Sequence, residues 1–544
     1  MAAESHCQMK SAESCDEPEI VLTILHFNDV YEIKERSEDP VGGAARFATA
    51  VKQFQDLNPL IVFSGDCLNP SLLSTITKGK HMVDILSKLG VNCAVYGNHE
   101  FDFGVDHLEE MTAQMDFPWF LSNVYDRFTS DTLGHGVVSR VLRWNGLEIG
   151  LMGLVEEEWL DTLGTVDKEN LHYVDYVSVA GDLARQLRAQ GAQMVVALTH
   201  MRWHNDVRLA AEAAGIDLVL GGHDHEYGVR EVNGVPVVKS GSEFRYLSKV
   251  DVSRREGGGG GFRFAVHRVP VEKHLIEDPA IKQIVDGYNN NVEHMLEEVL
   301  CQIEVELDGR CTTVRRKECI LGNLITNAML EATHADVALL NSGTLRSDTV
   351  HPAGPLTMHD LLQILPMQDP VLVVEASGRQ LYEGLENAVR NYPALDGRFP
   401  QVAGMQFGFD PQGSPGNRVV MDTIKVQGQS LDKDKKYLVA MKEYLTKGKD
   451  GYTMFAECRK MFDIENAQTL STVLINHFES GKIIRGLKTC RSGHRMSLIK
   501  ASSSPSVSAM ERTPRGKTAA VMTVPRVEGR IFHVTRDGQS EASN

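Results

Sequence analysis

Six side chains that can bind a metal ion stand directly after short apolar runs of this sequence. Glycines adjoin several of them, and glycine permits tight turns and close backbone approach. A mixture of carboxylate, amide and imidazole donors suits a pair of divalent ions such as Zn, Mn or Fe. These six residues are Asp29, Asp66, Asn98, His200, His223 and His225.

The apolar runs have the length and composition of buried β-strands. They read LIVFSGD, NCAVYGN, QMVVALTHM and IDLVLGGHDH, and each carries Gly, Asp, Asn or His among its last residues. Between the first two, TKGKHMVDILSKLG has the apolar spacing of a helix. This alternation predicts an α/β domain over residues 20–272, with the polar residues gathered at the carboxyl ends of its strands.

The remainder of the chain divides into a connecting segment, a second domain and two tails. Residues 273–304 are predicted to form a linker helix, because PAIKQIVDGYNNNVEHMLEEVL reads as a helix with polar faces. Residues 305–490 form a second, smaller α/β segment. The N-terminal residues 1–19 and the Ser-, Pro- and basic-rich residues 491–544 are predicted to be disordered.

Composition narrows the class of protein. A chain of 544 residues is too long for a single ordinary core, and its net charge of −17 argues against a nucleic-acid polymer as partner. No apolar run is long enough to cross a membrane, and neither terminus resembles a secretory or lipid-anchor signal. Nine scattered cysteines do not suggest a disulfide framework, so we expect a cytoplasmic protein.

The spacing of the GNHE and GGHDH stretches resembles that of the calcineurin-like metallophosphoesterases, and with the second domain the chain resembles the 5′-nucleotidase family over residues 20–490. The resemblance implies an N-terminal β-sandwich flanked by helices and a site for two divalent metal ions. By it, Asp66 bridges the ions, Asn98, His200 and His223 complete one coordination shell, and Asp29 and His225 contribute to the other. Two such ions deprotonate a bridging water for in-line attack on phosphorus.

The same resemblance implies catalytic roles for two further residues. His99 is not a metal ligand in relatives, and it would stabilise the transferring phosphoryl group or the leaving oxygen. Asp102, three residues later, would hold the His99 ring through its other nitrogen. His99 and Asp102 are therefore the expected catalytic pair.

Tyr31 departs from the family pattern. Relatives carry Asp-x-His where this chain has Asp29-Val30-Tyr31, so the first ion lacks an imidazole ligand. A phenol with a pKa of about 10 is a poor ligand for Zn or Mn at neutral pH. Tyr31 either leaves its position to water or binds ferric iron as a phenolate, and we expect the first ion to be the weaker one.

The second domain resembles the substrate domain of the nucleotidases in three places. Guanidinium groups hold anionic oxygens, and an aromatic face holds a planar base. The stretches VRRKECILGNL, LLNSGTLRSD and EYLTKGKDGY supply the matching residues. They are Arg315, Asn341, Arg346, Tyr444 and Asp450.

Met367 weakens the likeness to a nucleotide site. It stands where relatives have a phenylalanine that helps to sandwich the base, and one base–aromatic stack contributes about 1–3 kcal/mol. The leading prediction is a metal-dependent phosphomonoester hydrolase acting on nucleoside monophosphates. The alternatives are a phosphatase of sugar-type or other small organic phosphates, such as mannosylglucosyl-3-phosphoglycerate, and a pseudoenzyme that only binds its ligand. The oligomeric state is not predicted.

Overall fold

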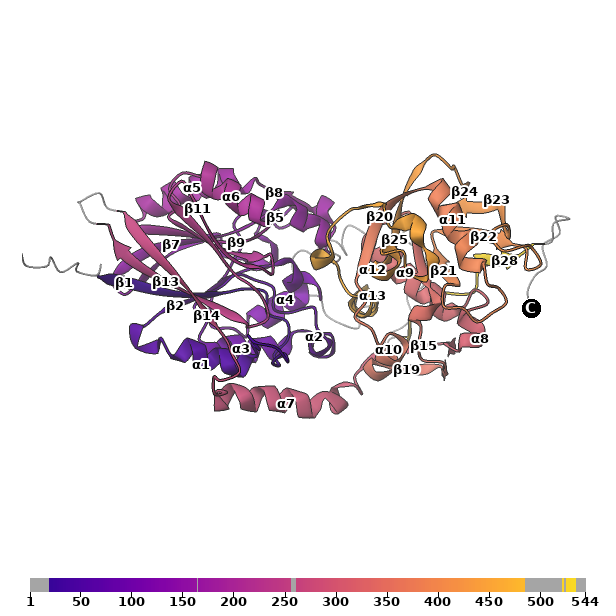
Figure 1. Cartoon of the computed structure of the whole chain (residues 1–544), viewed down its shortest axis with the longest axis horizontal. Coiled ribbons are helices and arrows are strands. Elements are labelled where there is room, and N and C mark those ends of the chain that lie inside the picture. Colours follow the sequence, from indigo (N-terminus) through magenta and orange to yellow (C-terminus); the bar gives the residue numbers. More distant parts are fainter. Residues whose placement is uncertain (1–18, 164, 256–260, 485–520, 523–524, 535–544) are drawn as a thin grey trace, which may run out of the picture.

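The computed structural model describes residues 19–163, 165–255, 261–484, 521–522 and 525–534 (Figure 1). Two lobes follow one another along the sequence, and the predicted α/β fold with two domains is confirmed. Of the N-terminal segment predicted to be disordered, only Glu19 is described.

The first lobe is built on two six-stranded sheets packed face to face. In spatial order, the first sheet contains β14 (Phe262–Pro270), β13 (Tyr246–Arg254), β1 (Ile20–Phe27), β2 (Leu60–Phe63), β3 (Cys93–Val95) and β4 (Trp119–Phe120). The second contains β11 (Tyr227–Val232), β12 (Val235–Ser240), β10 (Leu218–His223), β9 (Met194–Met201), β7 (Leu147–Val155) and β6 (Ser139–Trp144). The predicted β-sandwich is therefore present, with the four expected strands as β2, β3, β9 and β10.

Both sheets are apolar on both faces because helices cover their outer sides. On β1, Leu22 and Ile24 point into the sandwich, whereas Leu25 and Phe27 pack under the helices. Helices α1 (Ala44–Lys52), α3 (Lys80–Leu89) and α4 (Val105–Thr112) share a core with the first sheet. Helices α5 (Tyr176–Ala189) and α6 (Trp203–Glu212) cover the second sheet.

Parallel pairing directs the ligand-bearing loops to one edge of the sandwich. Strands β1, β2 and β3 run parallel in the first sheet, and β7, β9 and β10 run parallel in the second. Carboxyl ends of parallel neighbours lie at the same edge, so the loops after β1, β2, β3, β9 and β10 converge there.

The predicted linker helix over 273–304 is shorter than expected. Helix α7 spans Pro279–Met295 and runs along the edge of the molecule from the first lobe toward the second (Figure 1). Asp278 caps its start by accepting the backbone N–H groups of Ala280 and Ile281. Residues Val299–Ile303 form strand β15 instead, because the alternating run VLCQIEV favours an extended backbone and pairs with β19 (Gly354–Thr357).

A five-stranded sheet is the centre of the second lobe. Its order is β21 (Pro400–Ala403), β17 (Val337–Asn341), β25 (Lys436–Lys442), β20 (Val371–Ser377) and β26 (Arg459–Lys460). Helices α9 (Ile320–Thr333) and α13 (Leu470–Ile484) pack on one face, and α11 (Gly378–Val389) packs on the other. A smaller sheet continues this core with β24 (Gln429–Ser430), β23 (Val419–Val426), β22 (Met405–Phe409) and β28 (Ile531–His533).

The prediction of disorder over 491–544 is wrong for the part of the tail that the structure describes. Strand β27 (Val521–Met522) pairs with β15, and β28 pairs in parallel with β22. Buried Glu318 accepts the backbone N–H groups of Glu528 at 2.7 Å and Arg530 at 2.6 Å. The apolar run RIFHV supplies a short strand with a buried Ile531, a signal that the surrounding Ser- and Pro-rich composition masked.

Segments of the second lobe close over the edge of the sandwich where the loops converge. Gln468 donates to Asp102 at 3.0 Å, and Asn69 of the first lobe donates to Thr472 on α13 at 3.4 Å. Arg202 forms an ion pair with Asp463 at 3.2 Å. Within the described ranges, no helix combines the length and the apolar composition needed to span a bilayer.

Candidate active site

Backbone strain marks the loops at the sandwich edge. Asp29, Asp66 and His223 have φ angles of 53°, 66° and 78°, in the left-handed region that costs a non-glycine residue energy. Gly97 lies so close to Asp66 that a Cβ would fall 2.1 Å from the carboxylate Oδ1. Such strain is stored where the surrounding structure needs a side chain in one particular place.

Asp66, His200 and His223 form a compact, buried group of metal donors. One donor atom from each lies within 4.8 Å of the others, and among the described residues this is the one such group of three. His200 Nδ1 lies 2.8 Å from the Ser64 carbonyl, so Nδ1 donates there and Nε2 points toward Asp66 at 3.1 Å. Three donors of these types at this spacing fit a divalent ion.

Two atoms beside this group show that it fits an ion. Asn98 Oδ1 is buried and has no hydrogen-bond partner, although buried polar atoms are almost always paired. His200 Nε2 is also buried, and it faces the Asp66 carboxylate at 3.1 Å. Burial lowers the pKa of His200, but the charge of Asp66 outweighs burial and raises that pKa to about 9. The pocket therefore favours positive charge next to His200 Nε2, where a metal ion and a proton compete.

The expected donors of the first ion surround the Tyr31 hydroxyl. Tyr31 Oη lies 3.2 Å from Asp29 Oδ1, 3.1 Å from Asp66 Oδ2 and 3.1 Å from His225 Nε2. Asp29 also accepts the backbone N–H of His223 at 2.9 Å. Burial, and next the charge of Asp66, raise the pKa of Tyr31 well above its usual value.

His99 and Asp102 lie together beneath the same edge. His99 Nδ1 is 2.8 Å from Asp102 Oδ2, and His99 Nε2 is 2.6 Å from the Glu465 carbonyl of the second lobe. Burial lowers the pKa of His99, but the charges of Asp102 and Asp66 raise it to about 10. His99 therefore carries its proton at neutral pH and can donate through Nε2.

A cavity of about 280 Å³ joins this centre to the second lobe. Tyr31, His99 and His225 line one side of it. Gln368 and Pro370, from the loop that carries Met367, line the other together with Glu465. The cavity places the expected metal donors and the expected substrate domain around one space.

In the second lobe, the structure brings three of the predicted substrate residues into one hydrogen-bonded group. Asp450 accepts the Asn341 side-chain amide at 2.8 Å through Oδ2 and the Tyr444 hydroxyl at 2.9 Å through Oδ1. Asp450 adopts a φ of 51°, another left-handed residue at a predicted site. Tyr444 is 38% exposed, so its ring is open to a ligand.

The other predicted substrate residues lie around this group without joining it. Arg315 donates to the Leu395 carbonyl at 3.1 Å, and its buried Nε has no partner. Arg346 is exposed, and its charge acts to lower the pKa of Tyr444, although the hydrogen bond to Asp450 and burial raise that pKa overall. Met367 is 49% exposed on its loop.

Two protein-family models match the chain in sequence order. A calcineurin-like phosphoesterase model matches residues 22–227, which hold the metal donors. A model of the 5′-nucleotidase C-terminal domain matches residues 299–457. The chain belongs to the 5′-nucleotidase family.

Similar proteins agree with the two models. The 5′-nucleotidase of Mus musculus is 27% identical over 490 residues, which cover 80% of this chain and 84% of the relative. That of Bos taurus is 28% identical over 492 residues, with the same coverage of both chains. The solved NAD nucleotidase of Haemophilus influenzae has the same fold, with a TM-score of 0.68, 17% identity and coverage of 84% of this chain and 96% of that structure. This member of the 5′-nucleotidase family is a metal-dependent phosphomonoester hydrolase.

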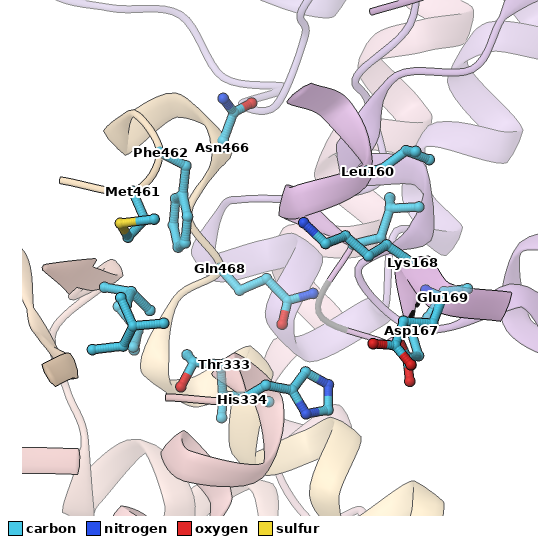
Figure 2. Close-up of a pocket in the computed structure, with 17 residues that line it drawn as sticks. Leu160, Asp167, Lys168, Glu169, Thr333, His334, Met461, Phe462, Asn466 and Gln468 are labelled. Atoms are coloured by element: carbon cyan, nitrogen blue, oxygen red, sulfur yellow. Dashed lines mark hydrogen bonds between the residues drawn. The ribbon is translucent and has the colours of Figure 1, made fainter. Parts of the chain in front are cut away.

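A larger cavity of about 450 Å³ lies elsewhere between the lobes of this 5′-nucleotidase family member (Figure 2). Leu160 and Lys168 line it from the first lobe, and Phe462 and Gln468 from the second. Its walls are mainly apolar and hold no cluster of metal donors among the described residues. The Gln468 amide links this cavity to the catalytic pair, because it also donates to Asp102.

Sequence patterns missed several residues that hold the 5′-nucleotidase site in place. Lys239 is completely buried, and its ammonium group donates to the Gly222 carbonyl at 2.7 Å and to Asp224 at 2.6 Å. Glu465 acts through its carbonyl oxygen, for which side-chain identity gives no signal. A lysine inside an apolar strand, VPVVKS, was the one available hint of a buried charge pair.

Glu100 orients its neighbours through its carboxylate. Its carboxylate accepts the backbone N–H groups of Asp66 at 2.8 Å, Cys67 at 2.7 Å and Gly97 at 2.6 Å. These three bonds tie the loop after β2 to the loop after β3. Glu100 therefore fixes the strained backbone that holds Asp66.

Proposed function

We propose that the chain hydrolyses nucleoside monophosphates to a nucleoside and phosphate, with Asp66, Asn98, His200 and His223 holding a divalent ion. The observation that supports this proposal most is the shared cavity, which faces both His99 and the loop of Met367. When bound, the ion would supply Lewis acidity to the phosphoryl oxygens. Support for this ion comes from the unpaired Asn98 Oδ1 and from the approach of His200 Nε2 to the Asp66 carboxylate.

In this proposal the residues of the chain bind and orient the ester. His99 Nε2 donates to a phosphoryl oxygen or to the leaving oxygen, and Asp102 keeps the ring in place through Nδ1. The same Nε2 now lies 2.6 Å from the Glu465 carbonyl, so Glu465 has to withdraw when the substrate enters. Movement of the second lobe relative to the first would release Glu465.

Chelation tests the reaction class. Wild-type protein given Mn²⁺ or Zn²⁺ should hydrolyse p-nitrophenyl phosphate, and removal of the metal with EDTA should lower the rate at least about 100-fold, because a catalytic ion stabilises transition-state charge by several kcal/mol. Restored Mn²⁺ or Zn²⁺ should return the rate, whereas Ca²⁺ serves as the control. A protein without chelator-sensitive turnover for any of the ions would be a binding protein and not an enzyme.

Tyr444 and Asp450 supply the proposed nucleoside contacts, with Arg315, Asn341 and Arg346 around them. The exposed Tyr444 ring can stack on a base, and Asp450 accepts hydroxyl donors of the kind that ribose presents. One observation favours a second candidate. Met367 offers no second aromatic face, which suits a base-free sugar-type or small organic phosphate equally well.

Replacement of Tyr444 by alanine separates these two substrate classes. If the ring stacks on the base, Tyr444→Ala should lower kcat/KM for AMP by about 5- to 150-fold, which corresponds to about 1–3 kcal/mol per stacked base. Turnover of ribose 5-phosphate by the same variant is the internal control and should change little. Equal losses on both substrates, or a wild-type preference for ribose 5-phosphate over AMP, would overturn the nucleotide assignment.

We also propose that the protein works in the cytoplasm. Support comes from six described cysteines, five of them buried, none of which forms a disulfide. Thiols outside disulfides suit a reducing compartment. Separation of cell fractions would test the location, and recovery with the secreted or membrane fraction would contradict it.

A further inference from the structure

We propose that the Tyr31 hydroxyl takes the place of the first of the two ions that the family pattern implies, so that this chain holds one divalent ion. This inference concerns the metal content and does not depend on which phosphate ester is the substrate. It rests on the partners of the individual donor atoms in the two expected ion positions.

The donors of the first position are already hydrogen-bonded to one another through Tyr31. A phenol hydroxyl offers one proton and accepts through its lone pairs. Tyr31 Oη lies 3.1–3.2 Å from a carboxylate oxygen of Asp29, a carboxylate oxygen of Asp66 and the Nε2 atom of His225. The three groups that would bind an ion thus meet at the hydroxyl instead.

The two positions differ in which atoms lack a partner. At the second position, Asn98 Oδ1 is buried and unpaired, and His200 Nε2 faces the Asp66 carboxylate at 3.1 Å. At the first position, each oxygen of Asp29 has a hydrogen-bond donor, since Oδ1 accepts from Tyr31 and Oδ2 accepts from Asn28 and from the His223 N–H. A buried polar atom without a partner raises the free energy of the folded state. A bound ion would therefore lower that free energy at the second position only.

Packing holds the hydroxyl where it is. Tyr31 is only 5% exposed, and its ring lies edge-on to His99 and tilted against His225, with centroids 5.8 Å and 5.6 Å away. The backbone N–H of Tyr31 donates to Glu243 at 3.2 Å. The compact group of donors around Asp66 includes His200 and His223 but neither Asp29 nor His225.

Counting bound ions tests the inference without reference to activity. Metal-free protein is titrated with Mn²⁺ alone or Zn²⁺ alone, and bound metal per chain is measured by elemental analysis after removal of free ions. We expect one ion per chain for the wild type and two for Tyr31→His, which replaces the hydroxyl with an imidazole donor.

Tyr31→Phe separates a hydroxyl that occupies the position from a hydroxyl that binds an ion. If Oη fills the position, its loss exposes Asp29, Asp66 and His225 and bound metal stays at one ion or rises. If Oη is a ligand, the same change lowers bound metal below the wild-type value. Tyr96→Phe is the matched control, because it removes another buried hydroxyl, which donates to the Gly134 carbonyl at 3.0 Å.

Three results would overturn the inference. Two ions per wild-type chain would show that Tyr31 excludes nothing. One ion in Tyr31→His, with the fold verified by circular dichroism, would show that Tyr31 is not the reason for the single site. A visible absorption band in the wild type loaded with ferric iron, lost in Tyr31→Phe but kept in Tyr96→Phe, would identify the phenolate as a ligand.

Discussion

Replacement of Asp66 by asparagine should remove both bound metal and turnover. Asp66 lies in the compact donor group, pairs with His200 and accepts the His99 backbone N–H at 2.9 Å. The change keeps the shape of the side chain but removes its charge, and a catalytic ion supplies several kcal/mol of transition-state stabilisation. We expect turnover of p-nitrophenyl phosphate to fall at least about 10³-fold, because each 1.36 kcal/mol of barrier is a factor of ten.

A matched control distinguishes this effect from a general loss of structure. Asp251 is a buried carboxylate on β13 of the same sheet, and it accepts the Thr23 hydroxyl at 2.8 Å. Asp251→Asn should retain metal and turnover, even if its unfolding temperature falls. Full metal content in Asp66→Asn, measured by elemental analysis, would remove Asp66 from the proposed ligand set.

Replacement of His99 by alanine should lower turnover and leave the metal in place. His99 carries a proton at neutral pH and directs Nε2 into the cavity that the two lobes share. Loss of one positioned donor to a developing oxyanion costs about 10²–10³ in kcat. The expected result is therefore a fall of kcat in that range, with bound metal equal to the wild type.

Asp102 offers the companion test for the His99 variant. Asp102→Asn keeps a hydrogen-bond partner at His99 Nδ1 but removes the charge that stabilises the protonated ring. It should lower kcat less than His99→Ala, and the double variant should be no worse than His99→Ala alone. If His99→Ala loses its metal, His99 belongs to the coordination shell and not to the catalytic pair.

The sequence predicted the strands of the first domain and the polar residues at their carboxyl ends because that information is local. A strand such as Leu60–Phe63 and the loop that follows it are contiguous, so apolar periodicity and a terminal Gly65-Asp66 identify both together. The GNHE stretch similarly contains Asn98, His99 and the loop-fixing Glu100 within four residues. Parallel pairing of the strands then places these loops at the same edge of the sheet.

What the sequence left open depends on contacts between distant segments. The position of the Tyr31 hydroxyl is set by His225, 194 residues away, and the His99 partner Glu465 is 366 residues away. Lys239 is buried because Asp206 and Asp224 meet it from two other elements. Spacing rules carry no information on such pairs, and a backbone carbonyl has no residue type to recognise.

Strand β28, in the C-terminal tail, helps to stabilise the second lobe. Phe407 and Phe409 lie on β22 beside it, and Glu318 is only 4% exposed beneath residues 528–530. In a polypeptide that ends before residue 525, the Glu318 carboxylate would lose two backbone N–H donors. Strand β22, with its two phenylalanines, would become an unpaired edge strand. Such a shortened chain would be prone to self-association. The second lobe therefore needs residues well beyond the 299–457 segment that the family model matches.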